Sequence, residues 1–292
     1  MAKISWPFTG RILIVFFIIL AVAGCARQMA YRFADTYLAW QARSFVSLDS
    51  EQRGALRGNI DTLLQWHAEH EMPRYHALIG ELTEDLEKQN LNTERLSYYE
   101  QQMADYWLAI RQSALSPAQS LLPRLSDEQA DELIVSIAGN IQERADQYKE
   151  QTTAERRDES AESIAEQVER WFGEITDEQQ QIIKTWTQQM PDMTQLWIEY
   201  RVRWAEGLSE ALNQRHDSEQ LAALLELLFL QPEQLRSEEL NELGEQSQAL
   251  SRQALLELTD KLTTEQREHA IEKLNGWRTD LASMMRSRSV EI

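Results

Sequence analysis

One short pattern occurs four times in the chain: Leu48-Asp49-Ser50-Glu51-Gln52, Leu125-Ser126-Asp127-Glu128-Gln129, Ile175-Thr176-Asp177-Glu178-Gln179 and Leu262-Thr263-Thr264-Glu265-Gln266. In each copy an Asp, Ser or Thr can cap a helix by accepting a hydrogen bond from an unpaired backbone N–H group. The Gln three residues later can reach back to the N–H group of the capping residue. We therefore expect capping boxes at four helix starts, formed by Asp49 and Gln52, Ser126 and Gln129, Thr176 and Gln179, and Thr263 and Gln266.

Apolar residues between these starts recur at the spacing of one helix face, as at Leu96, Tyr99, Met103, Tyr106 and Ile110. The chain has only 10 Gly and 6 Pro in 292 residues, and no run is typical of a strand. This pattern predicts an all-α fold, an array of antiparallel helical hairpins with about ten to twelve helices. The spacing of the four caps is irregular, which excludes a fixed-period solenoid. Four prolines suit first-turn positions of helices: Pro73, Pro117, Pro191 and Pro232.

Composition excludes several classes of protein. The chain carries 29 Lys and Arg against 48 Asp and Glu, a formal net charge of −19, and a phosphate backbone would be repelled by it. We therefore expect no nucleic-acid partner. The single Cys cannot form a disulfide framework or a Cys-rich zinc site. We also find no nucleophile elbow and no Gly-rich phosphate loop, so an enzyme is not the favoured interpretation.

The N-terminus carries the features of a bacterial lipoprotein signal peptide. Lys3 and Arg11 precede an apolar run at 12–22, which is too short for a membrane span of about 20 residues. The run ends in Val22-Ala23-Gly24-Cys25, which resembles the lipobox of bacterial lipoproteins. The resemblance implies cleavage after residue 24 and a diacylglycerol anchor and a palmitate-type acyl chain on Cys25. Because Ala26 and not Asp follows the Cys, it also implies the periplasmic face of the outer membrane. A Gram-positive surface lipoprotein stays open.

These boundaries predict the domain organisation. A lipidated N-terminus at 25–27 precedes a helical domain at 28–287 and a short tail at 288–292. The polar stretch 149–163 is either a hinge between two halves or an exposed turn in one continuous domain.

Two resemblances to known families accompany this pattern. The Leu/Ile-Ser/Thr-x-x-Gln element is similar to the motif of Spy- and CpxP-type periplasmic chaperones, which are all-helical and independent of ATP. A longer resemblance rests on the order lipobox, first cap, Leu63-Leu64-Gln65-Trp66-His67 and Glu71-Met72-Pro73-Arg74-Tyr75. This order is similar to an uncharacterised family of proteobacterial lipoproteins, a domain of unknown function. It implies location and helical architecture, and no activity.

His67, His70 and Glu71 are the candidate metal ligands, because the spacing i, i+3 and i+4 places them on one face of an α-helix, with His76 just beyond. Imidazole and carboxylate groups at this spacing could hold a divalent ion. A polar cluster where two helices cross is the other interpretation. No cofactor besides the covalent lipid and this possible metal is expected.

Trp197, Tyr200 and Trp204 form an aromatic stripe, which predicts either a helix–helix core or a surface that binds a protein partner. The aromatic helix at 28–46 could pack on the domain or rest on the membrane surface. The apolar run 221–230 is expected to be a central core helix.

The favoured hypothesis is an outer-membrane-anchored periplasmic protein, non-enzymatic and chaperone-like, with a protein partner. The alternatives are a metal-binding protein or metal-dependent enzyme that uses the histidine cluster, and a structural envelope element that contacts peptidoglycan.

Overall fold

The computed structural model describes residue 28 and residues 31–290. All regular structure in these residues is helical, which confirms the all-α prediction, and the eleven α-helices fall within the expected range. The predicted signal peptide at 1–24 and the predicted lipidation site, Cys25, lie outside the described residues. Within the described residues, no helix combines the length and the hydropathy that a membrane span requires.

The helices are α3 (Ala34–Arg43), α4 (Ser50–Trp66), α5 (Met72–Glu87), α6 (Thr93–Leu121), α7 (Asp127–Lys149), α8 (Thr153–Phe172), α9 (Asp177–Gln189), α10 (Thr194–Asn213), α11 (Ser218–Leu230), α12 (Glu238–Asp260) and α13 (Thr264–Ser287).

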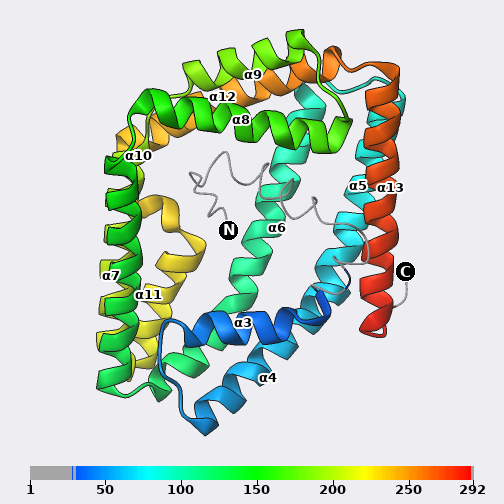
Figure 1. Cartoon of the computed structure of the whole chain (residues 1–292). Coiled ribbons are helices and arrows are strands. Elements are labelled where there is room, and N and C mark those ends of the chain that lie inside the picture. Colours follow the sequence, from blue (N-terminus) through cyan, green and yellow to red (C-terminus); the bar gives the residue numbers. More distant parts are fainter. Residues whose placement is uncertain (1–27, 29–30, 291–292) are drawn as a thin grey trace.

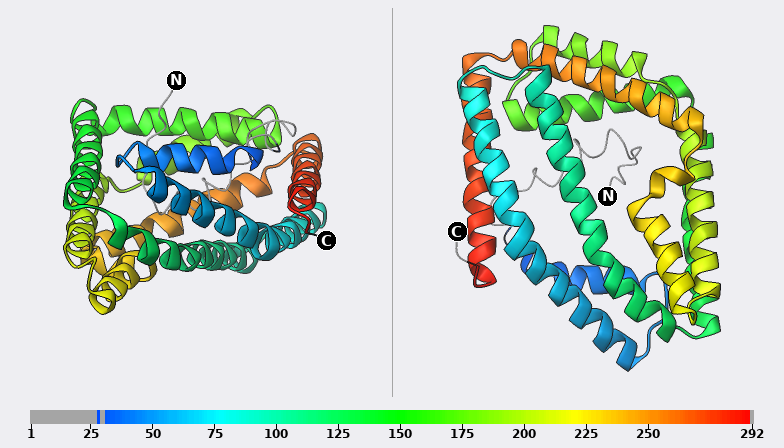
Figure 2. Two further views of the ribbon diagram at one scale, coloured as in Figure 1. Left: turned by 90° about the horizontal axis from the view of Figure 1, so that it is seen from below. Right: turned by 180° about the vertical axis from the view of Figure 1, so that it is seen from behind.

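The helices are arranged as the four sides of a frame (Figure 1). Helices α7, α10 and α11 make one side, α8, α9 and α12 the next, α5 and α13 the third, and α3 and α4 the fourth. The long helix α6 crosses the frame obliquely, as the view from behind in Figure 2 shows. Helices that are adjacent in sequence pack as pairs at α3/α4, α8/α9 and α10/α11. Four further pairs join helices that are not adjacent in sequence: α5 with α13, α6 with α11, α7 with α10 and α9 with α12.

All four expected capping boxes form, with both hydrogen bonds present in each. The structure adds that the boxes meet in pairs. In the first pair, the side-chain amides of Gln52 and Gln129 exchange two hydrogen bonds, each 2.8 Å from Nε2 to Oε1. Each Nε2 also donates to the carbonyl before the partner motif, Gln52 to Arg124 and Gln129 to Ser47, both at 2.6 Å. We call this pair the first clasp.

The second clasp repeats this arrangement with Gln179 and Gln266. Their amides exchange hydrogen bonds of 2.8 and 2.9 Å. Gln179 also donates to the Lys261 carbonyl at 3.1 Å and Gln266 to the Glu174 carbonyl at 2.7 Å. The first clasp joins the starts of α4 and α7 and the second joins the starts of α9 and α13, at diagonally opposite corners of the frame (Figure 1). The repeated motif therefore closes corners of the fold.

The apolar cores lie along the sides of the frame. The core between α5 and α13 includes Met72, Ile79 and Met285, all buried. Another core, around α10 and α11, includes Leu212 and Leu225, so the apolar run at 221–230 lies in a helix of the core as expected. Burying one such side chain stabilises the fold by about 1.5–3 kcal/mol.

Gly173 and four prolines take different positions relative to the helices. Gly173 ends α8 with a φ of 85°, which a residue with a Cβ rarely adopts. Pro73 and Pro232 stand in the first turns of their helices, as predicted. The prediction was wrong for Pro191, which lies in the loop before α10, and for Pro117, which lies inside α6. Packing of α6 on α4 and α11 holds the helix across the proline.

The polar stretch 149–163 contains the end of α7, a short turn and the first part of α8. A capping box of Thr152 and Glu155, which we did not predict, starts α8. Arg156 then pairs with Asp192 at 2.5 Å, which ties the start of α8 to the loop before α10. A hinge at this place stays a prediction.

Candidate functional site

The segment around Trp66-His67 is the candidate site, because its backbone departs from the α-helix. Residues His67–Glu71 form a π-helical turn, η1, between α4 and α5, and the Met72 N–H donates to the His67 carbonyl five residues earlier. Pro73 follows Met72 and has no backbone N–H group to donate. In a regular α-helix its ring would clash with the carbonyl group four residues earlier. The wider turn relieves that clash. Single π-helical turns are frequent at functional sites.

An aromatic cluster lies against η1 and consists of Tyr31, His67, Tyr75 and Tyr106. Neighbouring ring centroids are 6.3, 5.5 and 4.9 Å apart in that order, which is the range of favourable ring contacts. The Tyr31 hydroxyl donates to the Leu64 carbonyl at 3.0 Å. The cluster thereby connects the chain before α3 with η1, α5 and α6.

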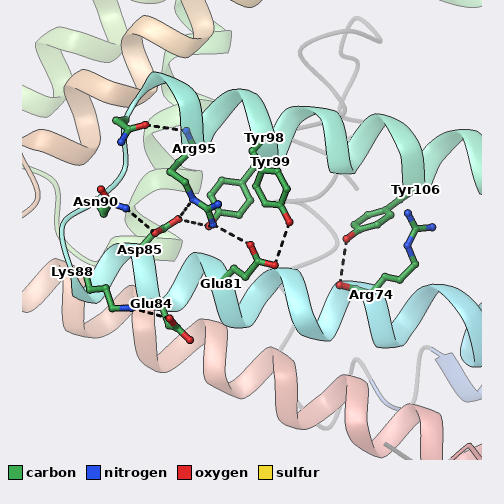
Figure 3. A network of polar contacts seen from close by, with 11 residues as sticks. Arg74, Glu81, Glu84, Asp85, Lys88, Asn90, Arg95, Tyr98, Tyr99 and Tyr106 are labelled. Atoms are coloured by element: carbon green, nitrogen blue, oxygen red, sulfur yellow. Dashed lines mark hydrogen bonds and ion pairs between the residues drawn. The ribbon is translucent and has the colours of Figure 1, made fainter.

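Arginines close the two ends of the aromatic cluster. The Arg74 guanidinium lies 4.5 Å from the Tyr106 ring centroid, and that of Arg288 lies 5.7 Å from the Tyr31 ring centroid. Figure 3 shows the Tyr106 hydroxyl pointing at the Arg74 backbone, where it donates to the carbonyl at 3.3 Å. The Arg74 Nη1 also donates to both carboxylate oxygens of buried Glu71, at 3.0 Å each, so that charge is paired.

The titrating groups of the aromatic cluster are held uncharged at neutral pH. Burial, and then the charge of Arg288, lower the pKa of His67 to about 4. The His67 Nδ1 atom is buried with no hydrogen-bond partner in the described part of the chain. Burial raises the pKa of Tyr106 to about 12 and raises the pKa of Tyr75 further. These rings can therefore pack, accept cation–π contacts and donate hydrogen bonds, and they do not exchange protons at neutral pH.

The proposed metal ligands do not converge. The spacing that puts His67, His70 and Glu71 on one face belongs to the α-helix, and η1 closes its turn over five residues. His70 is exposed, stacks on Trp66 and has its Nδ1 within 3.0 Å of the Trp66 carbonyl oxygen, while Glu71 is buried against Arg74. His76 follows on α5, beside Arg278. Among the described residues, no group of three or more His, Cys, Asp or Glu is placed to hold a metal ion. Metal binding here stays a prediction that this geometry does not favour, and elemental analysis of the purified protein tests it.

The aromatic stripe on α10 is only partly accessible. Trp197 is buried and packs with Met193 and Leu240, which corrects its place on the expected partner surface. Its indole fills the space between α10 and α12. Tyr200 and Trp204 are partly buried, and the Trp204 Nε1 donates to the Leu228 carbonyl at 3.2 Å. Partner binding through these two rings stays a prediction.

A polar network joins α5 to α6 beyond the aromatic cluster (Figure 3). Arg95 donates from Nε to Asp85 at 2.5 Å and from Nη2 to Glu81 at 3.1 Å, and its guanidinium lies over the Tyr98 and Tyr99 rings. The Tyr99 hydroxyl donates to the same Asp85 oxygen at 2.6 Å. Burial alone would raise the pKa of Asp85, but the hydrogen bonds from Tyr99 and Arg95 outweigh it and lower the pKa.

Asp85→Asn is expected to lower the free energy of unfolding at neutral pH by about 2 kcal/mol, because charge-assisted hydrogen bonds are lost. Since the folded pKa is lowered, the stabilisation is complete above the ordinary value of 3.8 and is lost as the pH falls through the folded pKa. Urea unfolding of both proteins at pH 7 and pH 3 checks this. Exposed Glu84→Gln is the matched control, and a difference that stays constant down to pH 3 would contradict the assignment.

Sequence reasoning missed most of this site. It singled out His67 and Glu71 but not Tyr75, Tyr106 or Arg288, which come from three other segments. Only the Pro73-Arg74-Tyr75 run next to the histidines could have suggested that the α-helical spacing breaks there.

Comparison with known families decides where the chain belongs. The model of a family of unknown function, DUF6279, matches residues 44–241, more than half of the chain. The chain is a member of the DUF6279 family. The matched region contains η1, the first clasp and the Arg95 network, whereas the second clasp has one motif inside it and one outside. Membership of a family of unknown function is thus confirmed, whereas the lipoprotein character and the proteobacterial origin of that family stay predictions. No curated protein and no solved structure matches significantly.

Proposed function

We propose that this DUF6279 protein is a lipoprotein of the bacterial envelope that binds a segment of another protein. The observation that carries the binding half of the proposal is the exposed indole of Trp107 on α6, 42% exposed. Met103 and Ile110 lie four residues before and three after it, hence on the same helix face, and both are partly buried. An aromatic ring flanked by apolar groups gives a large contact area at low entropic cost.

The place of Trp107 in the fold supports this surface. Helix α6 crosses the frame obliquely (Figure 2), and Trp107, near the middle of this helix, keeps 42% of its surface exposed. The helix packs mainly on α11 and α4 and more weakly on α12, and its residues Arg95, Tyr99 and Tyr106 also contact α5. A partner segment can add its own apolar groups to the partly buried face and remove the indole from water.

The Leu/Ile-Ser/Thr-x-x-Gln motif, which resembles that of Spy- and CpxP-type chaperones, does not by itself support a chaperone function for this protein. In each Leu/Ile-x-x-x-Gln element, the Gln amide is used within a clasp, and three of the four are buried: Gln52, Gln179 and Gln266. The motif therefore stabilises the fold. Chaperone-like binding of unfolded segments would have to use exposed apolar groups such as Trp107.

The anchoring half of the proposal rests on the sequence around Cys25. We expect the mature protein to begin at Cys25 with a diacylglyceryl group and an N-acyl chain, and to sediment with outer membranes, since Ala26 follows the Cys. Mass spectrometry of the intact protein checks the acyl mass. Cys25→Ser should abolish the modification, and an unmodified wild-type N-terminus would refute the anchor.

The binding half is tested by a photo-crosslinking amino acid at position 107 in intact cells. The matched control is position 112, a polar exposed site on the same helix. We expect a discrete adduct from position 107 only. Equal labelling from both positions would mean that no specific surface exists there.

A further inference from the structure

Helix α3 exposes its large aromatic side chains on one face. Phe33 stands at the N-cap position, and Tyr37 and Trp40 follow at i+4 and i+7, with exposed fractions of 58%, 59% and 55%. The Tyr37 and Trp40 rings touch, with centroids 5.9 Å apart. Three neighbouring exposed aromatic rings are unusual in a soluble protein and mark a site of interaction.

The opposite face of α3 is already used by the fold. Ala39 is buried and packs with Ile60 and Leu64 of α4, and Ala34 and Tyr31 lie against the same group. The helix is thus fixed to the frame in one orientation, and its aromatic face is directed away from α4. The described residues leave more than half of each of the three aromatic side chains exposed.

The chemistry of the face fits a lipid headgroup layer. Tyr and Trp are the residues enriched where membrane meets water, since their rings enter the acyl boundary while their polar atoms stay hydrated. Exposed Arg32 and Arg43 lie near the two ends of the helix and can pair with lipid phosphates. The one acid of the helix, Asp35, is two residues from both Phe33 and Tyr37, so it does not share their face.

The position of the face in the chain favours the same partner. Cys25 lies eight residues before Phe33, and eight residues can span at most about 29 Å even when fully extended. A lipid on Cys25 would therefore hold this face close to the bilayer. We infer that Phe33, Tyr37 and Trp40 form a membrane-docking surface that inserts into the headgroup region beside the anchor. This inference rests on the proposed lipidation of Cys25.

The test uses the full chain, processed in cells and reconstituted in vesicles of phosphatidylethanolamine and phosphatidylglycerol. Because Cys25 is the only Cys and its sulfur would carry the lipid, a new Cys in Tyr37→Cys or Trp40→Cys is the only free thiol. It is labelled with an environment-sensitive dye. Val135→Cys is the control, since Val135 is an apolar residue of α7, 70% exposed, on another side of the frame.

We expect the dye at positions 37 and 40 to shift its emission to the blue and to be quenched severalfold more by headgroup-labelled lipids than the dye at position 135. Equal quenching at all three positions would overturn the inference. A blue shift that requires an envelope extract and is absent with vesicles would also overturn it, because the occupant would then be a protein.

The anchor and the docking surface can be judged separately. Mass spectrometry of the same samples shows whether Cys25 carries acyl chains, whatever the dye reports. If it does not, the labelled positions are placed in a Cys25→Ser chain that is mixed with vesicles. Quenching at 37 and 40 there would uphold the docking surface without the anchor, and no quenching would overturn it.

Discussion

Replacing Gln179 by Ala is expected to lower the free energy of unfolding by about 3 kcal/mol, because buried groups of the second clasp lose their hydrogen-bond partners. Gln179 is fully buried. Its Oε1 accepts from the Thr176 backbone N–H and from the Gln266 amide, and its Nε2 donates to Gln266 and to the Lys261 carbonyl. An Ala side chain makes none of these four hydrogen bonds, and it leaves the volume of the Gln179 amide empty. Equilibrium denaturation with urea measures the change.

Two controls separate the clasp from general effects of truncation. Gln180→Ala removes an exposed amide from the next position and should change stability by no more than about 0.5 kcal/mol. Gln129→Ala removes the corresponding amide from the first clasp, which is only partly buried, so its cost should lie between the two. A cost at position 179 no larger than at 180 would show that the clasp does not hold the corner.

A double-mutant cycle tests whether the two amides act as a unit. The cost of Gln179→Ala together with Gln266→Ala should be smaller than the sum of the single costs, since each single change already leaves the other amide unpaired. Additive costs would mean that the reciprocal hydrogen bonds contribute little.

The second large effect is a loss of stability in mild acid that depends on His67. The folded pKa near 4 lies below the ordinary 6.5, so between these values the unfolded chain binds a proton that the folded chain does not. Stability is therefore complete above pH 6.5 and falls as the pH drops towards 4, by up to about 3 kcal/mol. The groups facing the ring are Tyr31, Tyr75 and Arg288, and Arg288 opposes protonation.

His67→Phe should remove most of this pH dependence. The phenyl ring keeps the ring contacts and replaces a buried nitrogen that has no partner, so stability at pH 7 should be unchanged or higher. His216→Gln, which removes an exposed imidazole, should leave the slope in place. Unfolding midpoints at several pH values between 7 and 4 provide the comparison. A slope that persists in His67→Phe would assign it to another group, such as His76.

The local part of the fold was predictable because its causes are local. An N-cap and the Gln three residues later are adjacent in sequence, so all four boxes could be placed from the pattern alone. Their pairing could not, because the partners are 77 and 87 residues apart and the pattern is identical in each copy. Any copy could have met any other until the helix lengths and turns were known.

The candidate site was less predictable, because it depends on a break in regular structure. The sequence predicts an α-helical spacing for His67, His70 and Glu71, whereas the π-helical turn before Pro73 changes which side chains share a face. The aromatic stripe on α10 left two alternatives open for another reason. Apolar rings at helical spacing predict one buried or binding face without saying which, and Trp197 is in the core whereas Tyr37 and Trp40 are exposed.

Crosslinking from position 107 in intact cells, followed by fractionation of the envelope, tests directly whether this protein is an anchored binder of another protein. We expect one main adduct that is found in the outer-membrane fraction, is absent for position 112, and moves out of that fraction when Cys25 is replaced by Ser. No adduct from position 107, or the same adducts from positions 107 and 112, would contradict the claim that this protein is an anchored binder of another protein.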